Sequence, residues 1–501
     1  VGAPTQITDV KPNSQPRREE LVKRVSAGIK NARVMVTDLS AVFEGSQNVE
    51  YILTTALGQS NVDPKIQYVL FAGINNPEGK HQYNGVGTVT TPQLSTLNFL
   101  QALQKDLKVT YDFQVRYGKD GSSRIEIQGK AKRSQQYIEG LRSMPSGIQC
   151  TQQISEDNYY QYACHKMLIL AHTPDNFEVS VEYKSVEPEA KNLTYRVYQL
   201  IKNIGFWNSD ENPMKVTAEE KIQIEVQADY LRGNYMNWAI TSKHGHFEMN
   251  NVNLPKWTVG AISTYSPWKA YDRVQNYYSN QQFKPFCSVD GTKVRTFSDR
   301  SYDYVLSPSW HLLMQDQASE KRSWHDIVVL GRKPSEKQQE LYISYKSETG
   351  KALEIEIQPG HGSQQNNVLV KTNGKKVSEG EVTMYWDEVA DSHLLYYFNQ
   401  PDGVLVLTIE DERLRVLYDG QRVVLISGDD SYRASTMGIC GRMTGERRHD
   451  YQTPYGIVDK AQFFGASYAL SGENEDLKLK ELQTQAKQQA YQPENKYTTI
   501  L

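Results

Sequence analysis

Hydrophobic and polar residues alternate along most of this chain, and the alternation predicts a protein built mainly from β-strands. The clearest case is residues 109–117, in which five apolar side chains are separated by polar ones: Val109, Tyr111, Phe113, Val115 and Tyr117. Because successive side chains of a strand point to opposite faces, this pattern predicts a half-buried antiparallel strand. Its expected partner is residues 124–129, which follow a turn rich in glycine and serine.

Further strand-like runs lie on both sides of this pair, separated by turn-forming residues, at 34–45, 51–58, 65–74, 177–183, 221–230 and 236–252. Two stretches have helical spacing instead. The first begins at Pro16 and places Leu21, Val25 and Ile29 on one face, with basic residues on the other. Those basic residues could bind a polyanion, but a solvated helix face is the preferred interpretation. The second stretch, residues 131–175, is predicted to form helices around Cys150 and Cys164.

From Cys287 to Leu470 short β-like runs recur every 8–12 residues, with turn signals between them. Asn373-Gly374 and Asp419-Gly420 each predict a tight two-residue hairpin turn. The fold class is therefore α+β and β-rich, with an antiparallel-sheet region and a few helices followed by a β-sandwich. The expected divisions are a β-rich region with helices, a linker or irregular packed segment, the sandwich, and a polar helical or disordered tail, at residues 1–254, 255–283, 284–470 and 471–501.

Composition narrows the class of protein. The 501 residues carry a net charge of −3, which favours neither nucleic acid nor an anionic membrane surface as a partner. No apolar run reaches the roughly 18 residues that predict a transmembrane helix. The first residues do not follow the pattern of a signal peptide. We therefore expect either a cytosolic protein or a mature product cut from a longer precursor.

The four cysteines form two plausible pairs, Cys150 with Cys164 and Cys287 with Cys440. An even number of cysteines without zinc-type spacing favours an exported, disulfide-bonded protein. Four buried free thiols in a cytosolic protein are the alternative. Asn192 begins an Asn-Leu-Thr sequon, which would mark a glycan site in a secreted protein and otherwise arises by chance.

The sequence lacks the motifs on which an enzyme would be recognised, such as a nucleophile elbow, a P-loop or a zinc-protease helix. His244 and His246 could supply two metal ligands from one strand. Without a cluster of carboxylates or cysteines beside them, a structural role is the preferred interpretation. We therefore expect a protein that is not an enzyme.

Several motifs resemble a known family. Residues 287–306 are similar to the start of a von Willebrand factor type D domain, and Gly438-Ile439-Cys440-Gly441 with residues 463–470 resembles its end. The Asp-Gly-Gln-Arg run at 419–422 is typical of insect-type vitellogenins, the egg-yolk precursors. Residues 1–280 are similar to the region upstream of that domain.

The resemblance implies that the sandwich is a type D domain closed by a Cys287–Cys440 disulfide. It also implies the C-terminal processed fragment of a large lipid-transfer protein that stores yolk and carries lipid, with the lipid held mainly by other parts of the assembly. Such a protein would be secreted into haemolymph, taken up through an oocyte vitellogenin receptor and deposited in egg yolk. The expected partners are lipids and the other fragments of the precursor. A homodimer, in which the partner is a second copy of the chain, is a further possibility.

The chain departs from the family at the calcium site of the D domain. Asp299 lies one position after the expected aspartate, which is replaced by Ser298. After Gly441, Arg442 and Thr444 replace expected ligands, and Asp450 alone matches. Calcium prefers several oxygen ligands, so Asp299 and Asp450 are weak calcium candidates.

A haemolymph clotting-type protein of the same superfamily is the alternative function. Its D domain would act as an assembly or interaction module. The polar tail contains glutamines that a transglutaminase could use, Gln483, Gln485, Gln488 and Gln489. Ordinary polar composition explains them equally well, and yolk storage is the preferred interpretation.

Overall fold

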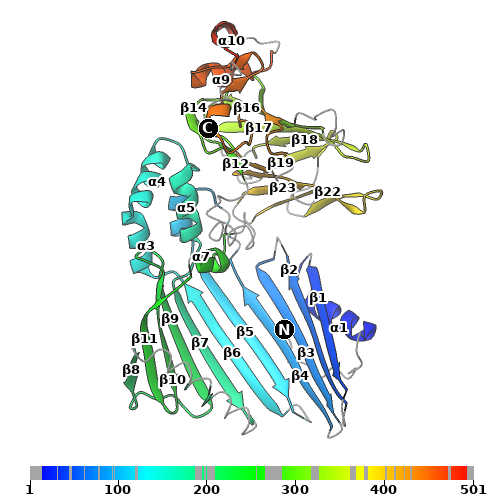
Figure 1. Cartoon of the computed structure of the whole chain (residues 1–501), viewed down its shortest axis with the longest axis vertical. Coiled ribbons are helices and arrows are strands. Elements are labelled where there is room, and N and C mark those ends of the chain that lie inside the picture. Colours follow the sequence, from blue (N-terminus) through cyan, green and yellow to red (C-terminus); the bar gives the residue numbers. More distant parts are fainter. Residues whose placement is uncertain are drawn as a thin grey trace, which may run out of the picture. The chain divides into compact units, whose positions relative to one another are not determined.

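A computed structural model of the chain describes the following residues: 14–30, 32–44, 48–60, 63–76, 79–92, 94, 96–118, 122–186, 195–196, 199, 209–255, 257–265, 285–316, 326–360, 368–376, 382–400, 403–410, 413–421, 424–428, 432–471 and 476–492. They divide into two compact units (Figure 1). The sheet unit contains Val1–Gln93, Lys105–Leu141 and His172–Thr264. The sandwich unit contains Leu94–Gln104, Arg142–Ala171 and Tyr265–Leu501.

The sheet unit is built on one antiparallel sheet of eleven strands (blue to green in Figure 1). Its strands are β1 (Arg33–Phe43), β2 (Val49–Gln59), β3 (Lys65–Asn76), β4 (Gly79–Thr90), β5 (Lys108–Tyr117), β6 (Ser123–Lys132), β7 (Asn176–Lys184), β8 (Ser209–Asn212), β9 (Lys221–Asp229), β10 (Tyr235–Ser242) and β11 (Gly245–Asn253). The spatial order follows the chain from β1 to β11, except that β8 pairs with β11 at the edge. The predicted pairing of residues 109–117 with 124–129 is confirmed by the β5–β6 register.

Helix α1 (Gln15–Ser26) packs against the first strands of this sheet. It begins after Ser14, whose hydroxyl accepts a hydrogen bond from the Arg17 amide at 3.3 Å, as expected of an N-cap. Leu21 and Val25 are fully buried in a cluster with strand residues Ile52 and Phe71. Burying each of these side chains contributes about 1.5–3 kcal/mol. The predicted apolar face of α1 is thus the face that packs on the sheet.

Within the described residues, the other helices that precede β12 are α2 (Phe99–Gln104), α3 (Gln135–Ser143), α4 (Pro145–Ser155), α5 (Tyr162–Ala171) and α7 (Trp257–Ile262). The prediction of helices in residues 131–175 is confirmed by α3, α4 and α5. Helix α7 lies in the segment predicted to be a linker or irregular, and residues 266–283 of that segment lie outside the described residues.

The sandwich unit contains two large antiparallel sheets. The eight-stranded sheet has the order β14, β13, β12, β25, β24, β23, β22 and β21, with bounds Ser301–Asp303, Lys293–Arg295, Phe286–Val289, Val424–Gly428, Leu414–Tyr418, Leu405–Ile409, Ser392–Asn399 and Thr383–Asp387. The seven-stranded sheet has the order β20, β19, β18, β17, β16, β15 and β26, with bounds Lys375–Lys376, Leu369–Thr372, Ala352–Gln358, Gln338–Lys346, Asp326–Ser335, His311–Asp316 and Thr436–Met437. Apolar residues of both sheets form one buried core, which confirms the predicted sandwich.

The two predicted hairpin turns behave differently. Asn373 and Gly374 both have positive φ, and Thr372 pairs with Lys375, so this is the expected two-residue turn. At Asp419-Gly420 the prediction of a two-residue turn is wrong. Tyr418 pairs with Val424, which leaves a longer loop, and Asp419 is not among the residues with positive φ. Its carboxylate instead accepts a hydrogen bond from the Gln421 amide at 2.9 Å, as in an Asx-turn.

The compact units do not follow the expected boundaries at residues 254 and 284. Helices α4 and α5 belong with the sandwich, because the loop between them is bonded to the β12–β13 turn. The buried carboxylate of Asp290 accepts a hydrogen bond from the Tyr160 amide at 2.7 Å. The Asn158 side chain donates to Thr292 Oγ1 at 2.9 Å. Such long-range bonds have no signature in the local sequence pattern.

The C-terminal part of the sandwich unit contains η4 (Arg447–His449), β27 (Gln452–Thr453), β28 (Gly456–Ile457), α9 (Ala461–Ser467) and α10 (Leu477–Gln489). Helix α10 packs on α9 and buries Ala486. The Gln483 amide donates to the carbonyls of Ala466 and Ala469, at 3.0 and 2.8 Å. Residues 477–489 of the predicted polar tail are thus a helix that packs on the sandwich unit.

Candidate functional site

One face of the eleven-stranded sheet is apolar across nearly all of its strands. The strand register places one side chain from each of eight successive strands in a single row on this face: Met35, Leu57, Tyr68, Gly87, Phe113, Ile127, Val181 and Ile222. A neighbouring row continues the apolar residues towards the far edge of the sheet: Val89, Tyr111, Gly129, Val179, Ile224, Ile240 and Phe247. Of these, Val89 and Phe247 are buried. We call these two rows, together with Leu39, Phe43, Tyr51 and Leu53, the apolar face.

The opposite face has a different character along its length. Its first four strands carry Val36, Ala56, Val69 and Val86, which lie in or beside the core formed with α1. Beyond these strands the same row becomes polar and charged: Gln114, Glu126, Glu182 and Lys221. Along most of the sheet, therefore, polar residues occupy one face and apolar residues the other.

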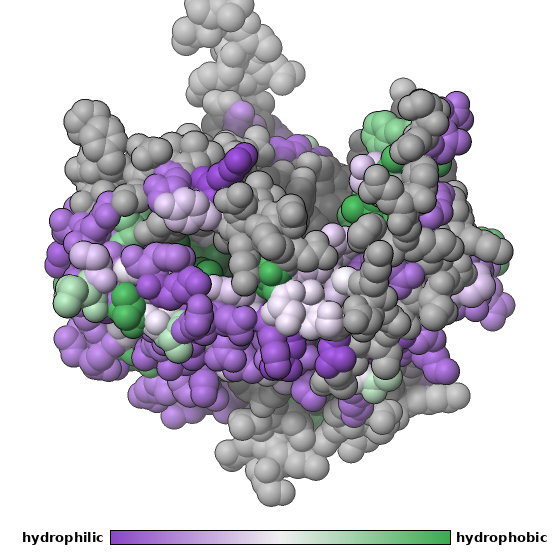
Figure 2. Space-filling view, turned by 90° about the horizontal axis from the view of Figure 1, so that it is seen from below, coloured by the Kyte–Doolittle hydropathy of each residue, from purple (hydrophilic) through white to green (hydrophobic). Residues whose placement is uncertain are grey.

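Side chains of the apolar face are well exposed at the β1 end. Met35 is 61% exposed, Leu39 58% and Phe43 63%, which far exceeds what a protein core allows. Monomeric proteins rarely leave a continuous apolar patch of this kind uncovered, and such patches usually mark an interaction surface. Viewed along the strand ends in Figure 2, hydrophilic residues predominate, and hydrophobic ones form small groups between them.

The middle of the apolar face is flattened by aromatic rings that lie over glycines. A Cβ atom at Gly87 would come 2.1 Å from Cδ1 of Phe113, so the ring occupies the space above that glycine. A Cβ at Gly129 would lie 3.3 Å from Cδ2 of Tyr111. Burial, and then the neighbouring Tyr68, raise the pKa of the Tyr111 hydroxyl. The phenol is therefore neutral at physiological pH.

On the opposite face, α1 is held by a buried ion pair. The Arg17 side chain is fully buried and donates to Asp38 Oδ1 at 3.2 Å and to Thr54 Oγ1 at 2.8 Å. Arg18 donates to Asp38 Oδ2 at 3.0 Å. Burial opposes ionisation of Asp38, but Thr54 and the two arginines outweigh it and lower its pKa. The expectation that the basic face of this helix is solvated is therefore wrong for Arg17, which is buried and fastens the helix to the sheet.

The described residues contain both cysteine pairs as disulfides. Cys150–Cys164 links α4 to α5 over a sequence separation of 14, and Cys287–Cys440 links β12 to the segment after β26 over a separation of 153. By loop entropy alone, these bonds contribute about 3 and about 5 kcal/mol. Asn192, the expected glycan site, lies outside the described residues.

The Gly-Ile-Cys-Gly motif is explained by close contacts of its two glycines. Gly438 and Gly441 both have positive φ. A Cβ at Gly438 would lie 2.5 Å from the Leu313 carbonyl oxygen, and one at Gly441 would lie 2.6 Å from Asp450 Oδ1. Only glycine fits positions that combine this backbone conformation with so little space. The amides of Ile439 and Cys440 donate to Leu312 and Leu313, each at 3.0 Å.

The two calcium candidates do not form a suitable calcium site. Asp299 accepts a hydrogen bond from Arg295 Nε at 2.6 Å and pairs with Arg447 at 3.3 Å. Asp450 is fully buried and accepts a hydrogen bond from Thr296 Oγ1. Two guanidinium groups at one carboxylate disfavour a divalent cation, which needs several oxygen ligands. The residues at this position therefore do not fit calcium.

His244 and His246 do not form a pair of metal ligands. His246 is buried, and its ring nitrogens contact Thr241 Oγ1 at 2.7 Å and Glu248 Oε1 at 2.5 Å. His244 is exposed at the adjoining turn. Within the described residues, no group of three or more histidine, cysteine, aspartate or glutamate side chains is arranged to hold a metal ion. No helix of the described part is long and apolar enough to cross a membrane.

Comparison with known proteins first defines the class of the sandwich. The model of the von Willebrand factor type D domain matches residues 287–457. This range contains both cysteines of the longer disulfide and most strands of the two sheets. The expected type D domain is confirmed.

The whole chain has relatives among curated proteins. It is 45% identical over 498 residues to vitellogenin of Bombyx mori, covering 99% of this chain and 28% of that protein. It is 26% identical over 461 residues to vitellogenin-2 of Periplaneta americana, covering 90% of the chain and 24% of the relative. Vitellogenin of Anthonomus grandis is 24% identical over 478 residues, with coverages of 90% and 26%. The chain belongs to the insect-type vitellogenin family and spans about a quarter of the length of these relatives.

Sequence patterns predicted only part of the apolar face. The strand at 109–117 was identified because its polar and apolar residues alternate cleanly. In β1 and β2 the exposed residues Leu39 and Leu53 were not singled out, because α1 makes the other face of these strands apolar as well. One signal could have revealed these residues. The strands β1 and β2 carry apolar residues on both faces, and a single amphipathic helix can cover only one face of a sheet.

Proposed function

We propose that this chain is part of a yolk storage and lipid-transport protein, and that it contacts lipid through the apolar face of its sheet. One observation carries the proposal: an apolar face whose large side chains are up to 63% exposed at the β1 end, opposite a largely polar face. Hydrocarbon chains have no polar groups to satisfy, so a broad surface without fixed hydrogen-bonding partners suits them. Membership of the vitellogenin family supports the same proposal.

We further propose that the protein acts outside the cell, in haemolymph and egg yolk, and is taken up by oocytes through a receptor that recognises the assembly. Two disulfides in the described residues support an oxidising compartment. The other parts of the precursor are the proposed partners in lipid binding, because a single open sheet leaves one side of the lipid uncovered. A nutrient reservoir needs no catalytic site.

Alternating side chains permit a direct test of lipid contact. A phospholipid with a photoactivatable acyl chain is incorporated into the delipidated assembly, and labelled residues are mapped by mass spectrometry. Labels are expected at Tyr111 and Phe113, and not at Thr110 or Gln114, which point to the opposite face. Labels confined to other subunits, or spread equally over both faces, would overturn the proposal.

A matched pair of variants on β1 provides a second test. Leu39→Asp introduces a charge on the apolar face, and Ser40→Asp introduces the same charge at an exposed position on the other side of the same strand. Leu39→Asp is expected to reduce bound lipid, measured by native mass spectrometry, while Ser40→Asp leaves it unchanged. Equal lipid content in both variants would contradict a role for this face.

A further inference from the structure

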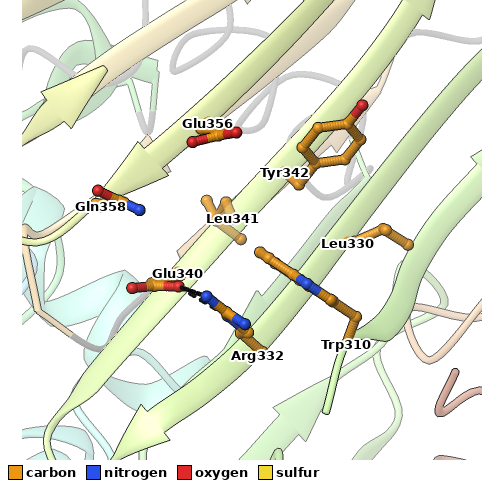
Figure 3. A pocket seen from close by; sticks show the side chains of 8 residues that line it. All are labelled: Trp310, Leu330, Arg332, Glu340, Leu341, Tyr342, Glu356 and Gln358. Carbon is orange, nitrogen blue, oxygen red and sulfur yellow. Dashed lines mark hydrogen bonds and ion pairs between the residues drawn. The ribbon is translucent and has the colours of Figure 1, made fainter. Parts of the chain in front are cut away.

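A second candidate site lies on the sandwich unit, on the outer surface of the seven-stranded sheet (Figure 3). It is a cavity of about 420 Å³, within the range of about 300–1,000 Å³ that small-molecule sites occupy. Strands β16, β17 and β18 supply the floor, and Trp310, just before β15, stands beside it. The lining residues are Trp310, Leu330, Arg332, Glu340, Leu341, Tyr342, Glu356 and Gln358.

The charges in this cavity are paired with one another. Arg332 donates to Glu340 through Nε at 2.7 Å and Nη2 at 2.6 Å. Lys371 on the neighbouring strand lies 3.4 Å from Glu356. Both cations are therefore paired with carboxylates, and Glu354, which hydrogen-bonds to Tyr342, adds a third carboxylate, so an anion is disfavoured. A neutral ligand is favoured over a phosphate.

The cavity nevertheless has several polar side chains, and hydrogen bonds to neighbouring residues fix the orientation of Arg332. Two donors on the same Glu340 oxygen, Oε2, hold the Arg332 guanidinium, which also lies 4.5 Å from the centre of the Trp310 ring. In Figure 3 Glu340, Gln358 and Glu356 follow one another along one side of the cavity. Carboxylates accept hydrogen bonds, and an amide both donates and accepts. This set suits a ligand with several neighbouring hydroxyl groups.

The other side of the cavity is aromatic. The rings of Trp310 and Tyr342 have centroids 6.4 Å apart and planes inclined by 62°. In Figure 3 both rings lie across the cavity from Gln358 and Glu356. Aromatic residues with a polar tip combine an apolar surface with hydrogen bonding, as a partly wetted site requires. A ligand with one apolar and one hydroxyl-bearing side would match both sides of the cavity.

We propose that this cavity binds a neutral sugar ring, such as a pyranose unit of a glycan. The C–H side of the ring packs against Trp310 and Tyr342, and its hydroxyls bond to Glu356 and Gln358. This activity is separate from lipid contact, which uses the other unit, so either proposal can fail without the other.

The test uses the full chain and saturation-transfer NMR with methyl pyranosides of glucose, galactose, mannose and N-acetylglucosamine, at concentrations up to about 10 mM. At least one sugar is expected to bind. Trp310→Ala and Gln358→Ala should each weaken that binding about ten-fold or more, a loss of about 1.4 kcal/mol. A glycopeptide bearing the same terminal sugar is run in parallel, to distinguish a free sugar from a glycan on a partner.

Trp386→Ala is the control for loss of a tryptophan from the sandwich surface, because Trp386 is 46% exposed but lies on β21 of the other sheet. It should leave sugar binding unchanged. Gln358→Ala removes only an amide from a partly exposed position, so it tests the proposal even if the Trp310 variant fails to fold. Absence of binding by all four sugars, undiminished binding in both cavity variants, or selective binding of choline or lysine in place of sugar would overturn the proposal.

Discussion

The strands of the sheet unit and of the sandwich unit share the same alternation of apolar and polar residues, but their apolar side chains differ in exposure to solvent. In the sandwich, β23 and β18 place Leu407 and Ile355 in a core shared by two sheets, and both side chains are fully buried. In the sheet unit, Leu39 of β1 occupies an equivalent alternating position and is 58% exposed. Alternation of apolar and polar residues therefore indicates that one face of a strand is apolar. It does not indicate whether protein or another apolar material covers that face.

The largest effect that separates the two units should come from the long disulfide. The double variant Cys287→Ala/Cys440→Ala frees a loop with a sequence separation of 153, which should cost about 5 kcal/mol of unfolding free energy. Hydrogen–deuterium exchange should show lost protection in β22 to β25 and unchanged protection in β5 to β7. Equal loss in both units would mean that they unfold together, contrary to their description as separate compact units.

Truncating an apolar side chain in each unit tests the comparison directly. Ile355→Ala creates a cavity in a closed core and should destabilise the sandwich by about 3 kcal/mol. Leu39→Ala removes an exposed side chain and should change stability by less than about 0.5 kcal/mol. Denaturant titration of lipid-free protein, followed by exchange in each unit, gives both values. A large loss with Leu39→Ala would show that protein, not lipid, covers this face.

The α1 end of the sheet unit should respond to loss of its buried arginine. Arg17→Leu leaves the nearly buried Asp38 carboxylate with Arg18 and Thr54 alone, and should cost about 2 kcal/mol. Arg24→Leu is the control, because its pair with Glu20 is partly exposed, at 21% and 46% of the two side chains, and is worth less than about 0.5 kcal/mol. Faster amide exchange in α1 should accompany only the Arg17 variant. If both variants behave alike, the buried pair does not hold the helix.

The smallest expected effect is the pH dependence that one buried carboxylate of the sandwich unit, Asp290, adds to its stability. Burial raises the pKa of Asp290 to about 6, although amides of Tyr160, Tyr159 and Gly291 oppose the shift. The folded protein therefore takes up this proton before the unfolded chain does. Its contribution favours folding as pH falls from about 7 to 5, by about 1 kcal/mol.

Asp290→Asn should remove that contribution, so its stability relative to the parent protein should decline as pH falls from 7 to 5. The parallel variant His311→Gln reports the opposite trend, because burial lowers the pKa of His311 to about 4. A buried neutral histidine costs stability as pH falls below about 6.5, since only the unfolded chain is then readily protonated. Thermal unfolding at the two pH values gives the comparison. A constant difference between Asp290→Asn and the parent would contradict the assigned titration.

Local sequence signals predicted the strands, the two-residue turn at Asn373-Gly374 and the general class of the fold. They could not predict which unit α4 and α5 join, because that is decided by bonds such as the one between Tyr160 and Asp290. The loop at Asp419 was mistaken for a tight turn because the Asp side chain competes for a nearby amide. The cavity beside Trp310 is assembled from residues on several strands, so no single stretch of sequence marks it.

The allocation of α4 and α5 to the sandwich unit has a consequence for biosynthesis. Residues Arg142–Ala171 leave the ribosome well before β12 and the closing Cys440 are made. Tyr160 and His165 are buried against Phe286 of β12, so they must remain uncovered until that strand has been synthesised. A truncated protein that begins at Lys284 would never receive these helices and should be insoluble or poorly folded. Experiments on the sandwich unit therefore need a protein that includes residues 142–171.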